Sequence, residues 1–198
     1  CFLFSSSLTP LLLREFSVAS ESNDLKKMKS LFGRYIPLLY SITAFFSCFA
    51  LVQSEKIILL LGGEIYLGSL IPLMLMVLYP IHQTYGQLSS SVFFATGQTK
   101  LYRNIGLFVM FFGLIISFIL MAPQEYSGLN LGALGLSIKM VVLQFIGVNI
   151  GLYFNARYLN LSFFRYLLHQ FGVILIFLLL GFLCSMAINK FIDTIVIS

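Results

Sequence analysis

The sequence predicts an all-α integral membrane protein built as a polytopic helical bundle, and three observations predict it. Of its 198 residues 59% are hydrophobic and only 10% are charged, whereas a soluble domain carries about a quarter charged residues. Apolar blocks of the length that crosses a hydrocarbon core of about 30 Å recur along the chain. Basic residues gather in every second connection between these blocks. This pattern excludes a soluble domain, a disordered chain and a transmembrane β-barrel.

We expect about five complete transmembrane helices and a partial one. The partial span covers residues 1–13, and the complete spans cover residues 35–53, 67–96, 104–122, 131–154 and 171–188. The span at 67–96 is long enough to be tilted or broken, and Pro72 and Pro80 are each expected to remove a backbone hydrogen bond and bend it. The chain starts inside one apolar run and ends as another begins, so we expect a fragment of a longer membrane protein.

The charges of the connections predict the topology. Nine basic residues lie in alternate connections: Arg14, Lys26, Lys27, Lys29, Arg34, Lys100, Arg103, Arg157 and Arg165. Lys56 and Lys190 lie in the others, and Lys139 lies within a span. Because membrane proteins concentrate Lys and Arg on the cytoplasmic side, we expect the nine to mark the cytoplasm. The net charge of +5 therefore needs no nucleic-acid partner.

The polar connection before the first complete span allows two interpretations. Over residues 25–31 apolar and basic positions interleave, which is typical of a helix lying in the headgroup region with its lysines near anionic lipid. A solvated loop explains the same residues, and the sequence leaves both open.

A polar stripe runs along the span at 67–96. Its members recur at helical spacing: His82, Gly86 and Ser89, with Gln83, Gln87 and Ser90 one residue on. Such a stripe is not expected to face lipid. It either lines a substrate path, with His82, Gln83 and Gln87 as candidate contacts, or holds helices together through interhelical hydrogen bonds.

Lys139 is the one unambiguous charge placed within a span. It lies eight residues after Leu131, so about 12 Å into the core at 1.5 Å per residue. It is either a cavity residue or an anchor whose stem carries the ammonium to the outer interface. Gln144 and Asn149, deeper on the same helix, are expected to be packing contacts.

No catalytic constellation is present, so we expect no enzyme, no metal and no cofactor. Cys1, Cys48 and Cys184 lie in apolar surroundings without metal-ligand spacing. His82 and His169 are far apart in the sequence, and neither has a local acidic partner.

Four short motifs occur in order along the chain. They are Leu8-Thr9-Pro10 before a polar loop, Gly63-Glu64-Ile65-Tyr66 outside a span, Ala95-Thr96-Gly97-Gln98-Thr99-Lys100 at a span end, and Gly128-Leu129-Asn130-Leu131-Gly132-Ala133 two spans after Tyr66. Their order and spacing resemble the second half of the Wzx-type polysaccharide-unit (O-antigen) flippases, which belong to the multidrug/oligosaccharidyl-lipid/polysaccharide exporter superfamily. The resemblance covers residues 1 to about 188.

The resemblance implies one lobe of a two-lobe transporter in the cytoplasmic membrane of a prokaryote. Its substrate would be an oligosaccharide unit on a polyprenyl diphosphate, and its partners would be the lipid bilayer and the missing N-terminal lobe of the same protein. A cationic cavity would suit the diphosphate, which makes Lys139 a candidate contact. A cation-coupled drug or metabolite exporter of the same superfamily is the alternative, although no span carries a clearly buried carboxylate. A non-transporting membrane scaffold is the third class, against which the polar stripe argues.

Overall fold

The computed structural model describes residues 2–197, and it describes side chains at residues 6–188 and 190. Every regular element in residues 2–197 is helical, which confirms the all-α fold class. In chain order the elements are α1 (Phe2–Glu21), α2 (Leu25–Val52), α3 (Ser54–Leu61), η1 (Glu64–Ser69), α4 (Leu70–Ala95), α5 (Thr99–Met121), η2 (Gln124–Tyr126), α6 (Gly132–Tyr158) and α7 (Phe163–Ile197).

Five helical segments are long and apolar enough to cross a membrane. They are Leu25–Val52, Glu64–Ala95, Thr99–Met121, Gly132–Tyr158 and Phe163–Ile188. These correspond in order to the five complete spans expected from the sequence. The segment 1–13, as far as the structure describes it, belongs to the longer helix α1.

Two connections that the sequence predicts between spans are helical in the structure. Residues 25–31 are the first two turns of α2, so the solvated loop is wrong, and the helical segment continues directly into the long helix. Asp24 begins this helix, because its side chain accepts a hydrogen bond from the Lys27 backbone N–H at 2.8 Å. Met28 and Phe32 are buried, and this packing continues the helix into the polar segment. In the same way α7 begins at Phe163 rather than residue 171.

Of the two prolines in α4, only Pro80 lies in the helix interior. Pro72 is the third residue of α4, where a backbone N–H has no intrahelical partner, so the expected loss of a hydrogen bond there is wrong.

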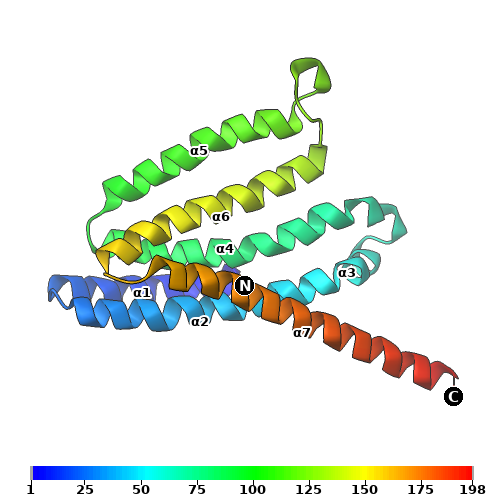
Figure 1. The fold of residues 1–198 in the computed structure, drawn as a ribbon, viewed down its shortest axis with the longest axis horizontal. Helices are drawn as coiled ribbons and strands as arrows, with labels where there is room; N and C mark the ends of the chain where they lie inside the picture. Colours follow the sequence, from blue (N-terminus) through cyan, green and yellow to red (C-terminus); the bar gives the residue numbers. More distant parts are fainter. Residues whose placement is uncertain (1, 198) are drawn as a thin grey trace.

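Successive long helices run in opposite directions (Figure 1). The turns at 22–24, 96–98 and 159–162 lie at one end, and the segments at 62–69 and 122–131 lie at the other. The buried core lies among α1, α2, α4 and α6, with Phe16, Phe32, Tyr40, Tyr85 and Leu152 fully buried. The α5–α6 hairpin leans away from α4 toward the second end, as Figure 1 shows.

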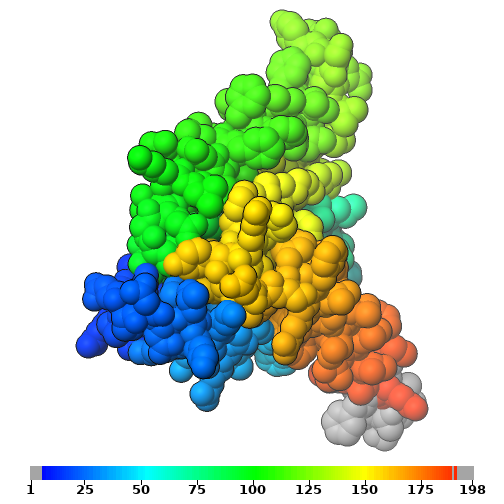
Figure 2. Space-filling view, turned by 60° about the vertical axis from the view of Figure 1, so that its left-hand side comes forward, coloured from blue at the N-terminus to red at the C-terminus, as the bar shows by residue number. Residues whose placement is uncertain are grey.

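Large apolar side chains cover the outside of the molecule. Figure 2 shows α5 and the later part of α7 standing at its periphery. On α5 the exposed fraction is 64% for Phe111 and 64% for Leu114, and on α7 it is 71% for Leu168. A large exposed apolar surface of this kind is expected to contact something other than water. Because these helices are long enough to span a bilayer, the contact is with lipid.

Candidate binding groove

A groove of about 540 Å³ lies between two pairs of helices, α1 with α4 and α5 with α6. This volume is within the range of about 300–1,000 Å³ that small-molecule sites have. Its lining on α5 comes from residues 102–109 and its lining on α6 from residues 143–151.

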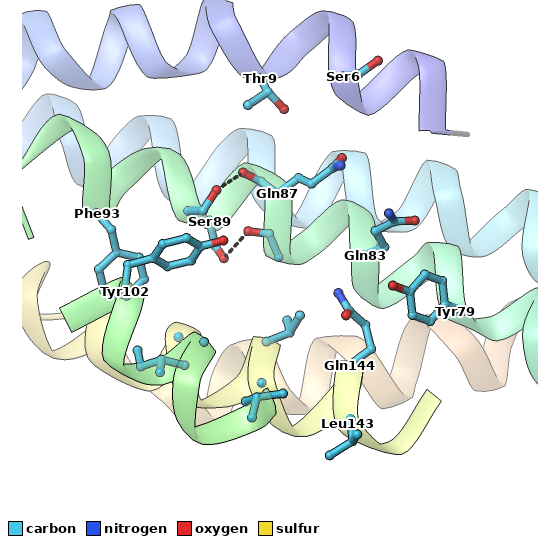
Figure 3. Close-up of a pocket in the computed structure, with 18 of the residues that line it drawn as sticks. Ser6, Thr9, Tyr79, Gln83, Gln87, Ser89, Phe93, Tyr102, Leu143 and Gln144 are labelled. Atoms are coloured by element: carbon cyan, nitrogen blue, oxygen red, sulfur yellow. Dashed lines mark hydrogen bonds between the residues drawn. The ribbon is translucent and has the colours of Figure 1, made fainter. Parts of the chain in front are cut away.

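The wall formed by α1 and α4 carries hydroxyl and amide groups. Ser6 and Thr9 come from α1, and Gln83 and Gln87 come from α4 on the side of α4 that faces α1 (Figure 3). Two serines of α4 are turned back onto their own helix, because Ser90 Oγ donates to the Gln87 carbonyl at 2.6 Å and Ser89 Oγ to the Gly86 carbonyl at 3.3 Å.

The opposite wall is mainly apolar. Ile105 and Val109 come from α5, and Leu143 and Val148 come from α6. Gly147 of α6 makes room for this wall, since a methyl group on it would lie 3.2 Å from Val109 Cγ2. Among the described lining residues, Gln144 is the one amide on this side, and Figure 3 shows it extending from α6 toward α4.

At the groove, α4 packs directly against α6. A methyl group on Gly86 would lie 2.8 Å from Val148 Cγ2, and one on Gly151 would lie 3.7 Å from the Phe93 ring. A buried hydrogen bond from Asn155 Nδ2 to the Ser89 carbonyl, 2.8 Å long, joins the same two helices. Small residues and an interhelical hydrogen bond are the usual means of holding membrane helices together.

The structure divides the polar stripe of α4 between two surroundings. Gln83 and Gln87 line the groove, whereas His82 does not. The His82 ring is 5% exposed and lies 6.2 Å from the Tyr40 ring and 5.1 Å from the Phe145 ring, between centroids. Because neighbouring residues on a helix point about 100° apart, His82 faces α2 and α6 while Gln83 faces the groove.

Lys139 lies outside the lining of the groove. Its stem runs along α5, with Cε 3.8 Å from where a methyl group on Gly113 would lie. It is half-buried, one turn nearer the start of α6 than Leu143. The structure therefore does not bring Lys139 together with Gln83 and Gln87.

Gln144 is the groove residue that sequence reasoning missed. It was expected to be a packing contact, but it lines the groove and forms no side-chain hydrogen bond to a described residue. The signal that could have found it is the spacing of Gln144, Gly147, Val148 and Gly151, which share one helix face. Asn149, in contrast, packs as expected, with its amide paired to that of Gln170 on α7.

A second polar cluster lies among α2, α4 and α7, with Tyr40 and Tyr85 buried and Ser41 and His169 half-buried. The Tyr40 ring lies 5.2 Å from the Tyr85 ring and 6.0 Å from the His169 ring, between centroids. Ser41 Oγ lies 3.5 Å from His169 Nε2. Among the residues whose side chains are described, no group of His, Cys, Asp and Glu is arranged to hold a metal ion.

The fold and the groove define this chain as a multi-pass α-helical membrane protein with a groove that has one polar wall, at the depth of its spans. Comparison with protein-family models, curated proteins and solved structures finds no significant match.

Proposed function

We propose that this chain is one lobe of a transporter that passes an oligosaccharide unit, carried on a polyprenyl diphosphate, from the inner to the outer leaflet of a prokaryotic cytoplasmic membrane. The observation that carries the proposal is the groove: amide and hydroxyl groups of α1, α4 and α6 line a hollow of about 540 Å³ at the depth of the spans. The order of the sequence motifs supports the substrate class. Alternating exposure of a site between this lobe and an N-terminal lobe would complete the transport path.

The chemistry of the groove suits a sugar. Glutamine amides both donate and accept hydrogen bonds, as sugar hydroxyls do. Gln83 and Gln144 make no side-chain hydrogen bond to a described residue. Tyr79 of α4 and Tyr102 of α5 add aromatic rings to the lining of the groove. In an apolar bundle such groups are costly unless something pairs with them, and a ligand rich in hydroxyls would do so.

The test replaces two groove amides in the full-length protein. Gln83→Leu together with Gln87→Leu should lower flipping of the lipid-linked unit at least about fivefold, while the amount of folded protein in the membrane changes little. The reason is that two neutral hydrogen bonds contribute about 0.5 to 1.5 kcal/mol each. Gln124→Leu, in the exposed short helix η2, is the matched control and should leave flipping unchanged.

Two outcomes would count against this assignment. Flipping that falls only in proportion to protein amount would make the two glutamines packing residues. Unchanged flipping in the double variant would remove the groove from the substrate path. Lys139→Ala, measured in parallel, separates a contact to the diphosphate from a lipid anchor, because only the contact lowers flipping more than it lowers protein amount.

A further inference from the structure

The two walls of the groove differ in chemistry. On the α1–α4 side the lining includes Ser6, Thr9, Gln83 and Gln87, whereas on the α5–α6 side the described lining, apart from Gln144 and Tyr102, consists of aliphatic residues and glycines. A ligand that fills the space must therefore present hydrogen-bonding groups on one side and C–H groups on the other. A sugar ring has this form, because its hydroxyls point outward from its edge and its faces carry C–H bonds.

Among the described residues that line the groove, none is charged. Lys139 is on the same helix as Leu143 and Gln144, but its stem lies along α5 at Gly113 and not in the lining. A phosphate or carboxylate in this groove would find no cation among those residues, and an unpaired charge at such depth is costly. The groove therefore favours an uncharged ligand over an acidic one.

The groove reaches the outer surface of the bundle beside α5. Tyr102 and Gly106 line it and are also exposed, with 39% of Tyr102 accessible. Both are in the span Thr99–Met121. A chain attached to a sugar in the groove can leave along α5 into the surrounding lipid without crossing the bundle.

We propose that the groove is a binding site for uncharged sugar residues of a glycolipid, with the hydroxyl edge on α1 and α4, the C–H face on α5 and α6, and the lipid chain leaving beside α5. This inference rests on the proposed function for its biological substrate, but it concerns binding alone. It assigns the sugar, and not the diphosphate, to this groove. It also makes the site selective for neutral over acidic sugars.

The experiment uses fluorescence, because the chain contains no tryptophan. Tyr79→Trp places a single reporter in the groove, replacing one aromatic side chain with another (Figure 3). Phe118→Trp places the matched reporter on α5 at a side chain that is 58% exposed. Each protein is placed in phosphatidylcholine nanodiscs and titrated with dodecyl maltoside or with dodecyl phosphate, which have the same chain and differ in the head.

In the Tyr79→Trp protein we expect a saturable fluorescence change with dodecyl maltoside and only a linear, partition-like change with dodecyl phosphate. The Phe118→Trp protein should respond to both probes alike. Adding Gln83→Leu and Gln87→Leu to the Tyr79→Trp protein should weaken maltoside binding about tenfold, the effect of losing two neutral hydrogen bonds. Displacement of a bound fluorescent maltoside from the Tyr79→Phe protein repeats the binding measurement without a tryptophan in the groove.

Equal binding of the two probes would overturn the neutral-sugar assignment, and so would an unchanged maltoside affinity in the glutamine variant. Identical responses of the Tyr79→Trp and Phe118→Trp proteins would show partition into lipid without a site. The two proposals can fail separately. Saturable maltoside binding together with unchanged flipping in the glutamine variants would support the sugar site and exclude its role in transport. Reduced flipping in these variants without saturable maltoside binding would exclude the sugar site.

Discussion

Gly86 occupies the point where α4 and α6 pack directly against each other. A methyl group on it would meet Val148 Cγ2 at 2.8 Å, which is shorter than a van der Waals contact allows. Valine is branched at Cβ and has a strongly preferred rotamer on a helix, so it cannot turn aside freely. The two helices would have to separate, and the Asn155 to Ser89 hydrogen bond nearby would lengthen.

Gly86→Ala should therefore be destabilising, although alanine favours the helix itself. Overpacking costs about 1 to 3 kcal/mol, against a gain of about 1 kcal/mol in helix propensity. Gly172→Ala is the matched control, because a methyl group on this helical glycine meets no atom within 4 Å. Unfolding in mixed micelles should place the free energy of unfolding of Gly86→Ala about 1 to 3 kcal/mol below that of Gly172→Ala. Equal free energies would contradict the close approach of α4 and α6.

At the scale of whole helices, α7 is held to the bundle by polar contacts in its first half. Gln170 is fully buried, and its Nε2 donates to Asn149 Oδ1 on α6 at 3.0 Å, while Asn149 Nδ2 lies 3.4 Å from Gln170 Oε1. Cys48 Sγ of α2 lies 3.8 Å from the Ile174 carbonyl of α7. Beyond Gly181 the α7 side chains that the structure describes are largely exposed, so the anchoring lies before that point.

A double-mutant cycle on the amide pair tests this anchoring. Asn149→Leu and Gln170→Leu should each destabilise the protein, because each leaves the partner amide buried without its hydrogen bonds. The two together should cost less than the sum, with a coupling free energy of about 0.6 to 1.7 kcal/mol, as for other interhelical hydrogen bonds in membranes. The measurement is the free energy of unfolding of the four proteins in the cycle. Additive effects would show that the pair does not join α6 to α7.

At the scale of the molecule, the alternation of long helices fixes which connections share a side of the membrane. The turns at 22–24, 96–98 and 159–162 lie together at one end (Figure 1). The helical turns that adjoin these connections carry Lys26, Lys27, Lys29, Lys100, Arg103, Arg157 and Arg165. The excess of Lys and Arg predicts that this end faces the cytoplasm. The fold and the charge pattern therefore agree on one topology.

Cysteine labelling from outside intact cells checks this topology. In a protein whose own cysteines are replaced, single cysteines are introduced at positions in or beside the connections. An impermeant maleimide should label Glu64→Cys and Gln124→Cys and should not label Ser22→Cys, Thr99→Cys or Ser162→Cys until the membrane is opened. The reverse pattern would invert the orientation, and labelling of neighbouring connections together would break the span assignment.

The pattern of polar residues within one span predicts some of the residues that line the groove but not the others. Gln83 and Gln87 were found because polar residues at helical spacing stand out in an apolar span. His82 belonged to the same polar stripe, yet it faces Tyr40 of α2 and Phe145 of α6. The stripe is wide enough that one side of it lines the groove while the other side packs against these helices. Gln144 was missed because a single amide on α6 becomes a groove residue only when α4 is placed opposite.

The sequence by itself determined the all-α membrane class, the five spans and their order, because hydropathy, span length and charge bias are local properties that the bilayer acts on directly. Only the tertiary structure decided where helices continue through polar segments, as at residues 25–31, and that Lys139 lies apart from the groove. The physical reason is that such outcomes depend on which faces of different helices meet. Helix packing in lipid is set by close contacts of small residues and by interhelical hydrogen bonds, and neither appears in the pattern of one helix.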